Sequence, residues 1–322
     1  MAIKVGINGF GRIGILTVRR MLFEHPSLEL VGINDLSSEA DLKNSFQNDL
    51  VYGFCEKNLD GVRFFQEKEP SFLPWTDLSC DIVLECSGFF THIDQAKKHL
   101  QAGARKVIIS APSDSQEIPT YLLGVNQEKY RFNQDHIISM GSCTTNAVAP
   151  MAKILDKNFG VKNGFVNTVH SYTNSQNKIF PYWRKDSAGK LSIIPSTTGA
   201  TKTIEKCLPQ LKEKLNGLSL RVPTETVSIV EFVFLAKKKT TAEAVNRALE
   251  KASKTDELQG ILKFETRKVV SSDLKGSSYS SIIDASLTQV FGKLIKVFAW
   301  YDNEWGYACR LAEMAEFVGL KL

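Results

Sequence analysis

Disulfide frameworks, metal-binding cysteine pairs and long apolar runs are all missing from this sequence of 322 residues. The six cysteines have none of the paired spacings of zinc sites or of small secreted domains, which is typical of a chain in a reducing cytosol. No apolar run approaches the length of a membrane span, and residues 1–5 start directly in strand-like sequence with no charged and apolar leader. We therefore expect a cytoplasmic protein with no metal and no membrane contact.

A strong excess of charge is also missing. The net charge is +5, and Lys237, Lys238 and Lys239 form the only tight basic cluster. Nucleic-acid-binding proteins combine a concentrated basic face with a recognisable reading module, and because no such module is found we expect no nucleic-acid partner. With 43% hydrophobic and 23% charged residues the composition is that of a globular protein, and its length favours two domains over one core.

The order of apolar runs predicts two different halves. Up to residue 142, short β-rich runs alternate with helical stretches, which favours a doubly wound parallel sheet of the Rossmann type. The expected strands are residues 3–8, 28–34, 81–86, 106–110 and 136–139, with a helix at 13–23. From residue 165 the strands become longer, which favours an α+β domain with a mixed, mainly antiparallel sheet. Its expected strands are residues 165–170, 227–234 and 294–301, with a helix at 241–252 that Thr240 and Glu243 start as a capping box.

A glycine motif at the end of the first expected strand indicates a dinucleotide site. Gly9-Phe10-Gly11-Arg12-Ile13-Gly14 opens a helix, so that the backbone can turn tightly and direct helix N–H groups at a pyrophosphate. Asp35 ends the second strand, where a carboxylate accepts hydrogen bonds from a ribose 2′-hydroxyl and repels a 2′-phosphate. NAD is therefore favoured over NADP. Ser87 and Ser110 end later strands at the same edge of the sheet.

One cysteine has the surroundings of a nucleophile. Cys143 lies in the run Ser142-Cys143-Thr144-Thr145-Asn146, just before the apolar helical stretch 147–155. Backbone N–H groups and the dipole at a helix start favour a thiolate, so we expect a lowered pKa for this thiol. A packing role is an equally open interpretation for Cys143, and it is the expected one for the remaining cysteines, which are Cys55, Cys80, Cys86, Cys207 and Cys309.

Other polar residues could serve this thiol and an anionic substrate. His170 ends the expected strand 165–170 and could deprotonate Cys143, although a histidine at a strand end is more often structural. The other histidines, His25, His92, His99 and His136, have no comparable neighbours in the sequence. A phosphate monoester needs donors of the kind found in the hydroxyl-rich turn Pro195-Ser196-Thr197-Thr198-Gly199 and in Arg221. Alternatively, the turn is only a helix cap and Arg221 only a surface arginine.

Together these motifs resemble those of the glyceraldehyde-3-phosphate dehydrogenase family over almost the whole chain. The resemblance is carried by residues 7–14, 142–146, His170, 195–199, 221–223 and 301–307. It implies that Cys143 is the nucleophile and His170 its base. It implies NAD-binding roles for Gly9, Gly11, Arg12, Ile13, Gly14, Asp35, Ser87, Ser110 and Asn303. It further implies phosphate or substrate contacts for Ser142, Thr144, Thr173, Lys185, Thr198, Gly199 and Arg221.

The resemblance also implies an activity and an organisation. The family oxidises glyceraldehyde 3-phosphate with NAD and inorganic phosphate, through a cysteine hemithioacetal and a thioester, to 1,3-bisphosphoglycerate, a step of glycolysis and gluconeogenesis. We expect an NAD-binding domain at residues 1–142, completed by a C-terminal helix at about 304–322, a catalytic domain at 143–303, and a homotetramer. The segment 174–191 is shorter than in the family, and Lys185 aligns with an arginine.

Alternative functions remain open from the sequence. A sister dehydrogenase acting on erythrose 4-phosphate would release the thioester to water, and the turn 195–199 argues against it. An NAD-binding paralogue with a regulatory or interaction role would not need both Cys143 and His170. A cysteine hydrolase without a cofactor would leave the glycine motif and Asp35 unexplained.

Overall fold

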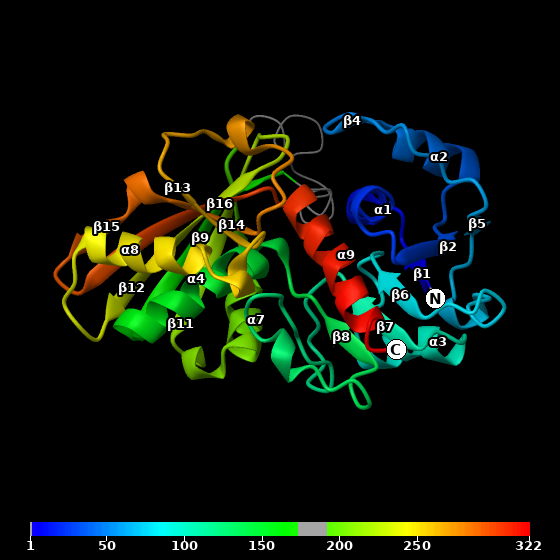
Figure 1. Ribbon diagram of the computed structural model, residues 1–322, viewed down its shortest axis with the longest axis horizontal. Helices are drawn as coiled ribbons and strands as arrows, with labels where there is room; N and C mark the ends of the chain where they lie inside the picture. Colours follow the sequence, from blue (N-terminus) through cyan, green and yellow to red (C-terminus); the bar gives the residue numbers. More distant parts are fainter. Residues whose placement is uncertain (1, 173–191) are drawn as a thin grey trace. The chain divides into compact units, whose positions relative to one another are not determined.

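The computed structural model describes residues 2–172 and 192–322, and the chain divides into two compact units. Unit 1 comprises residues 1–142 and 307–322, and unit 2 comprises residues 143–306. The unit 1 elements run from β1 to β8 and include the C-terminal part of helix α9 (Figure 1). Each unit has its own sheet. The predicted positions Thr173 and Lys185, and the segment 174–191, lie outside the described residues.

Unit 1 is built on a six-stranded sheet in the order β5-β2-β1-β6-β7-β8, and every neighbouring pair in it is parallel. Its strands are β1 (Ile3–Asn8), β2 (Leu28–Asn34), β5 (Arg63–Phe65), β6 (Ile82–Glu85), β7 (Lys106–Ile109) and β8 (Ile137–Ser139). The helices are α1 (Arg12–Glu24), α2 (Glu39–Gln47) and α3 (Ile93–Gln101), and β3 (Asn48–Asp49) pairs with β4 (Gly53–Phe54). Central strands such as β6 are buried along their whole length, as expected for a parallel sheet covered on both faces.

The C-terminal helix α9 (Trp305–Gly319) packs back on the first strand of unit 1. A β-carbon on Gly319 would lie 2.6 Å from Ile3 side-chain atoms, so the glycine permits this close approach. The Tyr307 hydroxyl donates to the carbonyl of Gly141 at 2.8 Å. Glu316 accepts a hydrogen bond from the Ser27 hydroxyl and contacts His25 Nδ1 at 2.8 Å. These contacts join the two ends of the chain in one unit.

Unit 2 is built on a mixed sheet of eight strands. The order is β10-β11-β9-β12-β16-β14-β13, with β15 on β16; β9 with β11 and β13 with β14 are parallel, and the other pairs are antiparallel. The strands are β9 (Val161–Ser171), β10 (Ile194–Thr197), β11 (Leu215–Val222), β12 (Ser228–Ala236), β13 (Leu262–Glu265), β14 (Ser281–Asp284), β15 (Gln289–Phe291) and β16 (Leu294–Tyr301). The parallel sheet of unit 1 and this mixed sheet confirm the predicted fold class.

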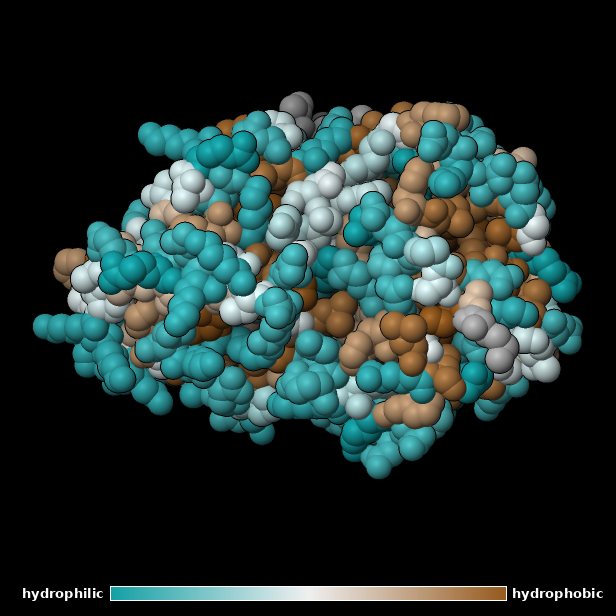
Figure 2. All heavy atoms as spheres, in the orientation of Figure 1, coloured by the Kyte–Doolittle hydropathy of each residue, from teal (hydrophilic) through white to brown (hydrophobic). Residues whose placement is uncertain are grey.

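Helices cover one face of the unit 2 sheet. They are α4 (Cys143–Phe159), α7 (Ala200–Cys207) and α8 (Ala242–Ser253), and α4 contacts both other helices and strands β9, β12, β14 and β16. Strand β12 alternates between buried and more exposed residues, because one of its faces packs against α4. Figure 2 shows mainly hydrophilic side chains over the face of the molecule that it presents, with small hydrophobic patches between them.

The ends of the elements follow from local signals and from strand pairing. Strands β1, β2 and β16 have the predicted bounds. Strand β9 is longer than the predicted 165–170, since it pairs along its length with β11 and β12. The predicted cap of α8 was wrong by one position: Thr241, not Thr240, is the N-cap and accepts a hydrogen bond from Ala244 N at 3.2 Å. Among the described residues no helix is long and apolar enough to cross a membrane.

Replacing the observed cap should weaken α8, and replacing its neighbour should not. Thr241→Ala removes the side-chain acceptor of the Ala244 N–H and should lower the free energy of unfolding by about 1 kcal/mol. Thr240→Ala is the matched control and should change it by less than about 0.5 kcal/mol. Urea unfolding followed by circular dichroism measures both, and a larger loss in Thr240→Ala would contradict the assignment.

Candidate active site

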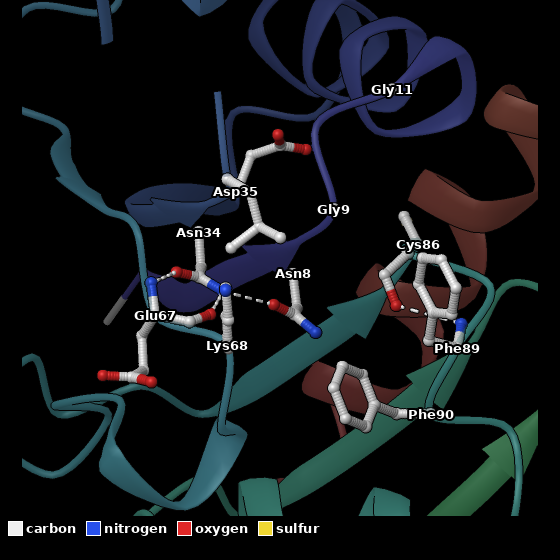
Figure 3. Close-up of a pocket in the computed structure, with 12 residues that line it drawn as sticks. Asn8, Gly9, Gly11, Asn34, Asp35, Glu67, Lys68, Cys86, Phe89 and Phe90 are labelled. Carbon is white, nitrogen blue, oxygen red and sulfur yellow. Dashed lines mark hydrogen bonds between the residues drawn. The ribbon is translucent and has the colours of Figure 1, made fainter. Parts of the chain in front are cut away.

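A pocket of ≈ 510 Å³ opens at the carboxyl ends of the unit 1 strands. Its walls include Asn8, Gly9 and Gly11 from the end of β1 and the turn after it, and Asn34 and Asp35 from the end of β2 (Figure 3). Glu67, Lys68, Cys86, Ser87, Phe89 and Phe90 complete the lining with Leu36. Parallel strands bring these segments, which are far apart in the sequence, to one edge of the sheet.

Each of the three glycines of the motif is needed for a different physical reason. Gly9 has φ +91, and a β-carbon on it would lie 2.4 Å from Ser87 N, so no other residue fits there. A β-carbon on Gly14 would lie 2.4 Å from the Gly9 carbonyl oxygen, so this glycine lets α1 approach β1. A β-carbon on Gly11 meets no atom within 4 Å, and because Gly11 lines the pocket, its missing side chain leaves room for a ligand.

These residues fit a dinucleotide. Helix α1 starts without a side-chain cap at Gly11, and its N-terminus therefore suits a phosphate. Asp35 Oδ2 accepts from Phe10 N at 2.8 Å and Oδ1 accepts from Ser37 N at 3.0 Å, which fixes the carboxylate beside the glycine turn. Figure 3 shows this carboxylate next to Gly9 and Gly11. A fixed carboxylate is the acceptor that a ribose diol requires.

Five predicted cofactor residues do not line this pocket, namely Arg12, Ile13, Gly14, Ser110 and Asn303. The Arg12 side chain pairs with Asp49 and lies over the Tyr52 ring, 5.7 Å from its centroid. Ile13 belongs to the first turn of α1. The Ser110 side chain forms a hydrogen bond with Cys86, whose pKa burial raises to about 12.

In unit 2, Cys143 and His170 lie in contact. Cys143 is the first residue of α4, His170 lies near the end of β9, and Sγ is 3.4 Å from Nε2. Strands β9 and β11 pair Arg221 with His170, which places Arg221 Nη1 2.6 Å from His170 Nδ1. A thiol, an imidazole and a guanidinium are therefore held together by the start of one helix and the register of two strands.

Burial controls the protonation of this group. It raises the pKa of the Cys143 thiol above its ordinary value, although the positive charge of Arg221 and hydrogen bonds with Thr144 act in the opposite direction. Burial therefore acts against the lowering of this pKa that the helix start predicts. Burial and, after it, the charge of Arg221 lower the pKa of His170 to about 3. At neutral pH the pair is a thiol beside a neutral imidazole.

The neutral imidazole has two possible partners at Nδ1. Nδ1 lies 2.9 Å from the Ser171 carbonyl oxygen, a hydrogen bond that requires a hydrogen on Nδ1. Arg221 Nη1 can only donate, so its contact with Nδ1 requires a lone pair there. Only the tautomer with Nδ1–H donating to Ser171 leaves the Nε2 lone pair facing Cys143 Sγ. The Arg221 position therefore bears on whether His170 can accept the thiol proton.

Three side chains near this group are fixed by hydrogen bonds. The Thr144 hydroxyl lies 2.9 Å from the Tyr301 hydroxyl, and the Tyr301 ring meets the His170 ring edge to face. Asn303 Oδ1 accepts from the Ser171 hydroxyl at 2.8 Å and from the Ser228 hydroxyl at 3.0 Å, which orients the amide. Tyr301 and Ser228 received no role from the sequence, because only strand pairing brings them to this group.

Donors for an anion are present in the same unit. Arg221 Nε is buried and has no hydrogen-bond partner among the described residues. Thr198 and Gly199 precede α7, where the Thr198 hydroxyl accepts from Ala200 N at 3.2 Å and Gly199 is the N-cap. Ser142, which belongs to unit 1, directly precedes α4 in the chain. Such groups suit phosphate oxygens.

Comparison with known proteins agrees with this chemistry. A family model described as glyceraldehyde 3-phosphate dehydrogenase, C-terminal domain, matches residues 142–303, and one described as its NAD binding domain matches residues 3–93. The chain belongs to the glyceraldehyde-3-phosphate dehydrogenase family. It is 45% identical to the enzyme of that name from Geobacillus stearothermophilus over 100% of this chain and 99% of that one. It is 43% identical to the enzyme of that name from Streptomyces coelicolor over 100% of both chains. It is 44% identical to glyceraldehyde-3-phosphate dehydrogenase 1 of Bacillus subtilis over 100% of this chain and 99% of that one.

Membership of this family makes the protein an NAD-dependent oxidoreductase. The comparisons do not favour the alternatives that the sequence left open, since the relatives named above carry the name of the main prediction.

Removing the charge of Arg221 should make the thiol less acidic. In Arg221→Met the thiolate of Cys143 loses a neighbouring cation, so the thiol pKa should rise by about one unit or more. Alkylation by iodoacetamide at pH 8 should then slow about tenfold, since only the thiolate reacts. Arg267→Met removes an exposed arginine of the same unit and is the control. Faster alkylation of Arg221→Met would contradict the electrostatic role.

Proposed function

We propose that this protein oxidises glyceraldehyde 3-phosphate with NAD and inorganic phosphate and forms 1,3-bisphosphoglycerate. The observation that carries the proposal is the contact of 3.4 Å between Cys143 Sγ and His170 Nε2 in a chain of this family. The relatives' name gives the substrate, and the family resemblance implies the inorganic phosphate. The reaction is a step of glycolysis and gluconeogenesis.

Cys143 and His170 carry out the covalent steps in this proposal. Cys143 Sγ bonds to the aldehyde carbon while the thiol proton moves to His170 Nε2, and His170 returns it to the aldehyde oxygen to give a hemithioacetal. His170 then removes the hydroxyl proton as the carbon is oxidised to a thioester. Bound NAD supplies the hydride acceptor. Phosphate attacks the thioester, the acyl phosphate leaves, and the thiolate regains a proton from His170.

Arg221 has two positions in this scheme. Its contact with His170 Nδ1 selects the tautomer that cannot accept a proton at Nε2, whereas an Arg221 that binds substrate phosphate leaves Nδ1–H to the Ser171 carbonyl. Substrate binding then favours the tautomer that can deprotonate Cys143. The unpartnered Nε of Arg221 supports such a second position.

The remaining site residues are assigned as the family resemblance implies. We assign Ser142, Thr144, Thr198, Gly199 and Arg221 to the substrate and phosphate, with Thr173 and Lys185 on the segment outside the described residues. Gly9, Gly11, Gly14, Asp35 and Ser87 hold NAD, together with the main chain of Arg12 and Ile13, Ser110, and Asn303 for the carboxamide. Residues 1–142 with the C-terminal helix form the NAD-binding domain, and 143–303 form the catalytic domain.

A homotetramer is the proposed assembly, and the open face of the unit 2 sheet is the proposed contact between copies. Apolar side chains stand exposed on this face, with Phe165 58%, Leu294 46%, Leu218 43% and Val169 41% exposed. Among them Glu231 forms an ion pair of 2.8 Å with Lys296 and accepts from Asn167 Nδ2 at 3.1 Å. A second copy of the same face would bury the apolar residues around this polar group.

We propose the cytoplasm as the location. All six cysteines, Cys143 included, are free thiols, and the proposed chemistry requires Cys143 in its reduced form.

The activity can be tested with purified protein, glyceraldehyde 3-phosphate and NAD, by following NADH absorbance with and without inorganic phosphate. We expect sustained turnover only with phosphate. His170→Asn should lower kcat by a factor of ~10² to 10⁴, since a positioned general base is lost, and Cys143→Ala should abolish the reaction. Turnover that does not depend on phosphate would contradict the proposal, as would an active Cys143→Ala protein.

The assembly can be tested by light scattering after gel filtration. Phe165→Asp places a charge in the middle of the exposed apolar face and should lower the molar mass below that of a tetramer. Phe72→Asp changes a phenylalanine of unit 1 that is 75% exposed and should leave the mass unchanged. A monomeric wild-type protein, or a Phe165→Asp protein that remains tetrameric, would rule out the proposed contact.

A further inference from the structure

A buried carboxylate ends the central strand β6, directly below the dinucleotide pocket. Glu85 is 1% exposed, and the residues before it in β6 are equally buried. Burial of a carboxylate is costly unless hydrogen-bond donors replace water. Glu85 does not line the pocket and has no part in the chemistry described above. The role of Glu85 is therefore sought in the donors that bind its carboxylate, rather than in a direct contact with the ligand.

Four donors surround this carboxylate. Oε1 accepts from Ser87 N at 2.8 Å and from the Ser87 hydroxyl, and Oε2 accepts from Asn8 Nδ2 and lies 2.9 Å from His99 Nε2. Phe89 N in turn donates to the Ser87 hydroxyl at 3.1 Å. Glu85 thus holds the turn that presents Ser87 and Phe89 to the pocket, and it sets the direction of Asn8.

The tautomer of His99 is fixed from its other side. Trp75 Nε1 lies 3.1 Å from His99 Nδ1, and an indole N–H can only donate. His99 Nδ1 must therefore accept, so that Nε2 carries the hydrogen and donates to Glu85. Both Trp75 and His99 are 0% exposed, and water cannot reverse this arrangement.

The same direction of hydrogen bonding continues into the pocket wall. Because Asn8 Nδ2 donates to Glu85, Asn8 Oδ1 accepts from Asn34 Nδ2 at 2.7 Å, and Asn34 Oδ1 accepts from Glu67 N at 2.8 Å. Figure 3 shows the Asn8, Asn34 and Glu67 links of this chain. Asn8, Asn34, Glu67 and Ser87 all line the pocket, so an acceptor outside the pocket orients the donors and acceptors in its wall.

We propose that Glu85 is a positioning residue for the dinucleotide. Its carboxylate orients Asn8 and Ser87, and through the close contact between Ser87 N and Gly9 it holds the glycine turn in its binding geometry. The inference rests on the NAD site of the proposed function and adds a residue that neither touches the ligand nor belongs to the glycine motif.

Glu85→Gln tests this role, because it keeps the shape and replaces one acceptor by a donor. The new amide N–H₂ faces donors on either side, and Trp75 prevents His99 from changing its tautomer. An unsatisfied buried donor disturbs the residues that form the pocket wall, so the Kd for NAD measured by calorimetry should rise about tenfold. The KM for NAD should rise in step, while kcat at saturating NAD should change by less than about twofold, since binding and not chemistry is affected.

A second substitution should restore part of the affinity. In Glu85→Gln/Trp75→Phe the indole donor is gone, so His99 can carry its hydrogen on Nδ1 and accept from Gln at Nε2. NAD should bind to this double variant more tightly than to Glu85→Gln, by about threefold or more. A merely structural role for Glu85 predicts the opposite order, because each substitution would add its own damage.

A matched control and a second pair of variants complete the test. Asp135 is 4% exposed and accepts from Tyr121 and Arg131 just before β8, at the opposite edge of the same sheet. Asp135→Asn should lower stability and leave the Kd for NAD unchanged. If Glu85→Gln does not fold, His99→Gln, which keeps an acceptor for Trp75 and a donor for Glu85, should bind NAD more tightly than His99→Phe.

The outcomes separate this inference from the proposed function. A wild-type protein that does not bind NAD would overturn the function. If the wild type binds NAD normally, three results would overturn the role of Glu85 alone. They are an unchanged Kd in Glu85→Gln, no recovery in the double variant, and equal affinity of His99→Gln and His99→Phe.

Discussion

Strand β6 ends in a carboxylate that has almost no contact with water, and the arrangement of the dinucleotide pocket depends on how that carboxylate is satisfied. Removing a charged group from water is tolerated only when donors replace the lost hydration. Ser87, Asn8 and His99 supply those donors. Asn8 and Ser87 also line the pocket, and Ser87 N lies close to Gly9. The need to satisfy one buried group therefore also determines the geometry of a binding surface.

The same constraint acts differently in unit 2. There, burial raises the pKa of Cys143 and lowers that of His170, which favours the neutral form of both groups. A charged thiolate and imidazolium would have to share this environment with the guanidinium of Arg221. In the proposed mechanism, proton transfer from Cys143 to His170 therefore accompanies substrate binding rather than preceding it.

Much of the fold could be predicted from local sequence. Strands β1, β2 and β16 have strong apolar patterns and clear ends, and the glycine motif carries its own physical reason in the close contacts of Gly9 and Gly14. The cap of α8 was misplaced by one residue because Thr240 and Thr241 satisfy the same local pattern. Only the backbone geometry decides which hydroxyl reaches Ala244 N.

The site could be predicted only where chemistry and sequence spacing coincide. Cys143 and His170 could be paired as a hypothesis, but the lowered thiol pKa expected from the helix start ignored burial, which no sequence motif reports. His99 has no hydroxyl-rich neighbourhood like that of His170 in the sequence, and its partners Trp75 and Glu85 come from a loop and a strand. Long-range pairing made that histidine part of a directed hydrogen-bond chain. Sequence motifs identify the residues that contact a ligand. The residues that position these contact residues are identified by their burial and by the direction of their hydrogen bonds.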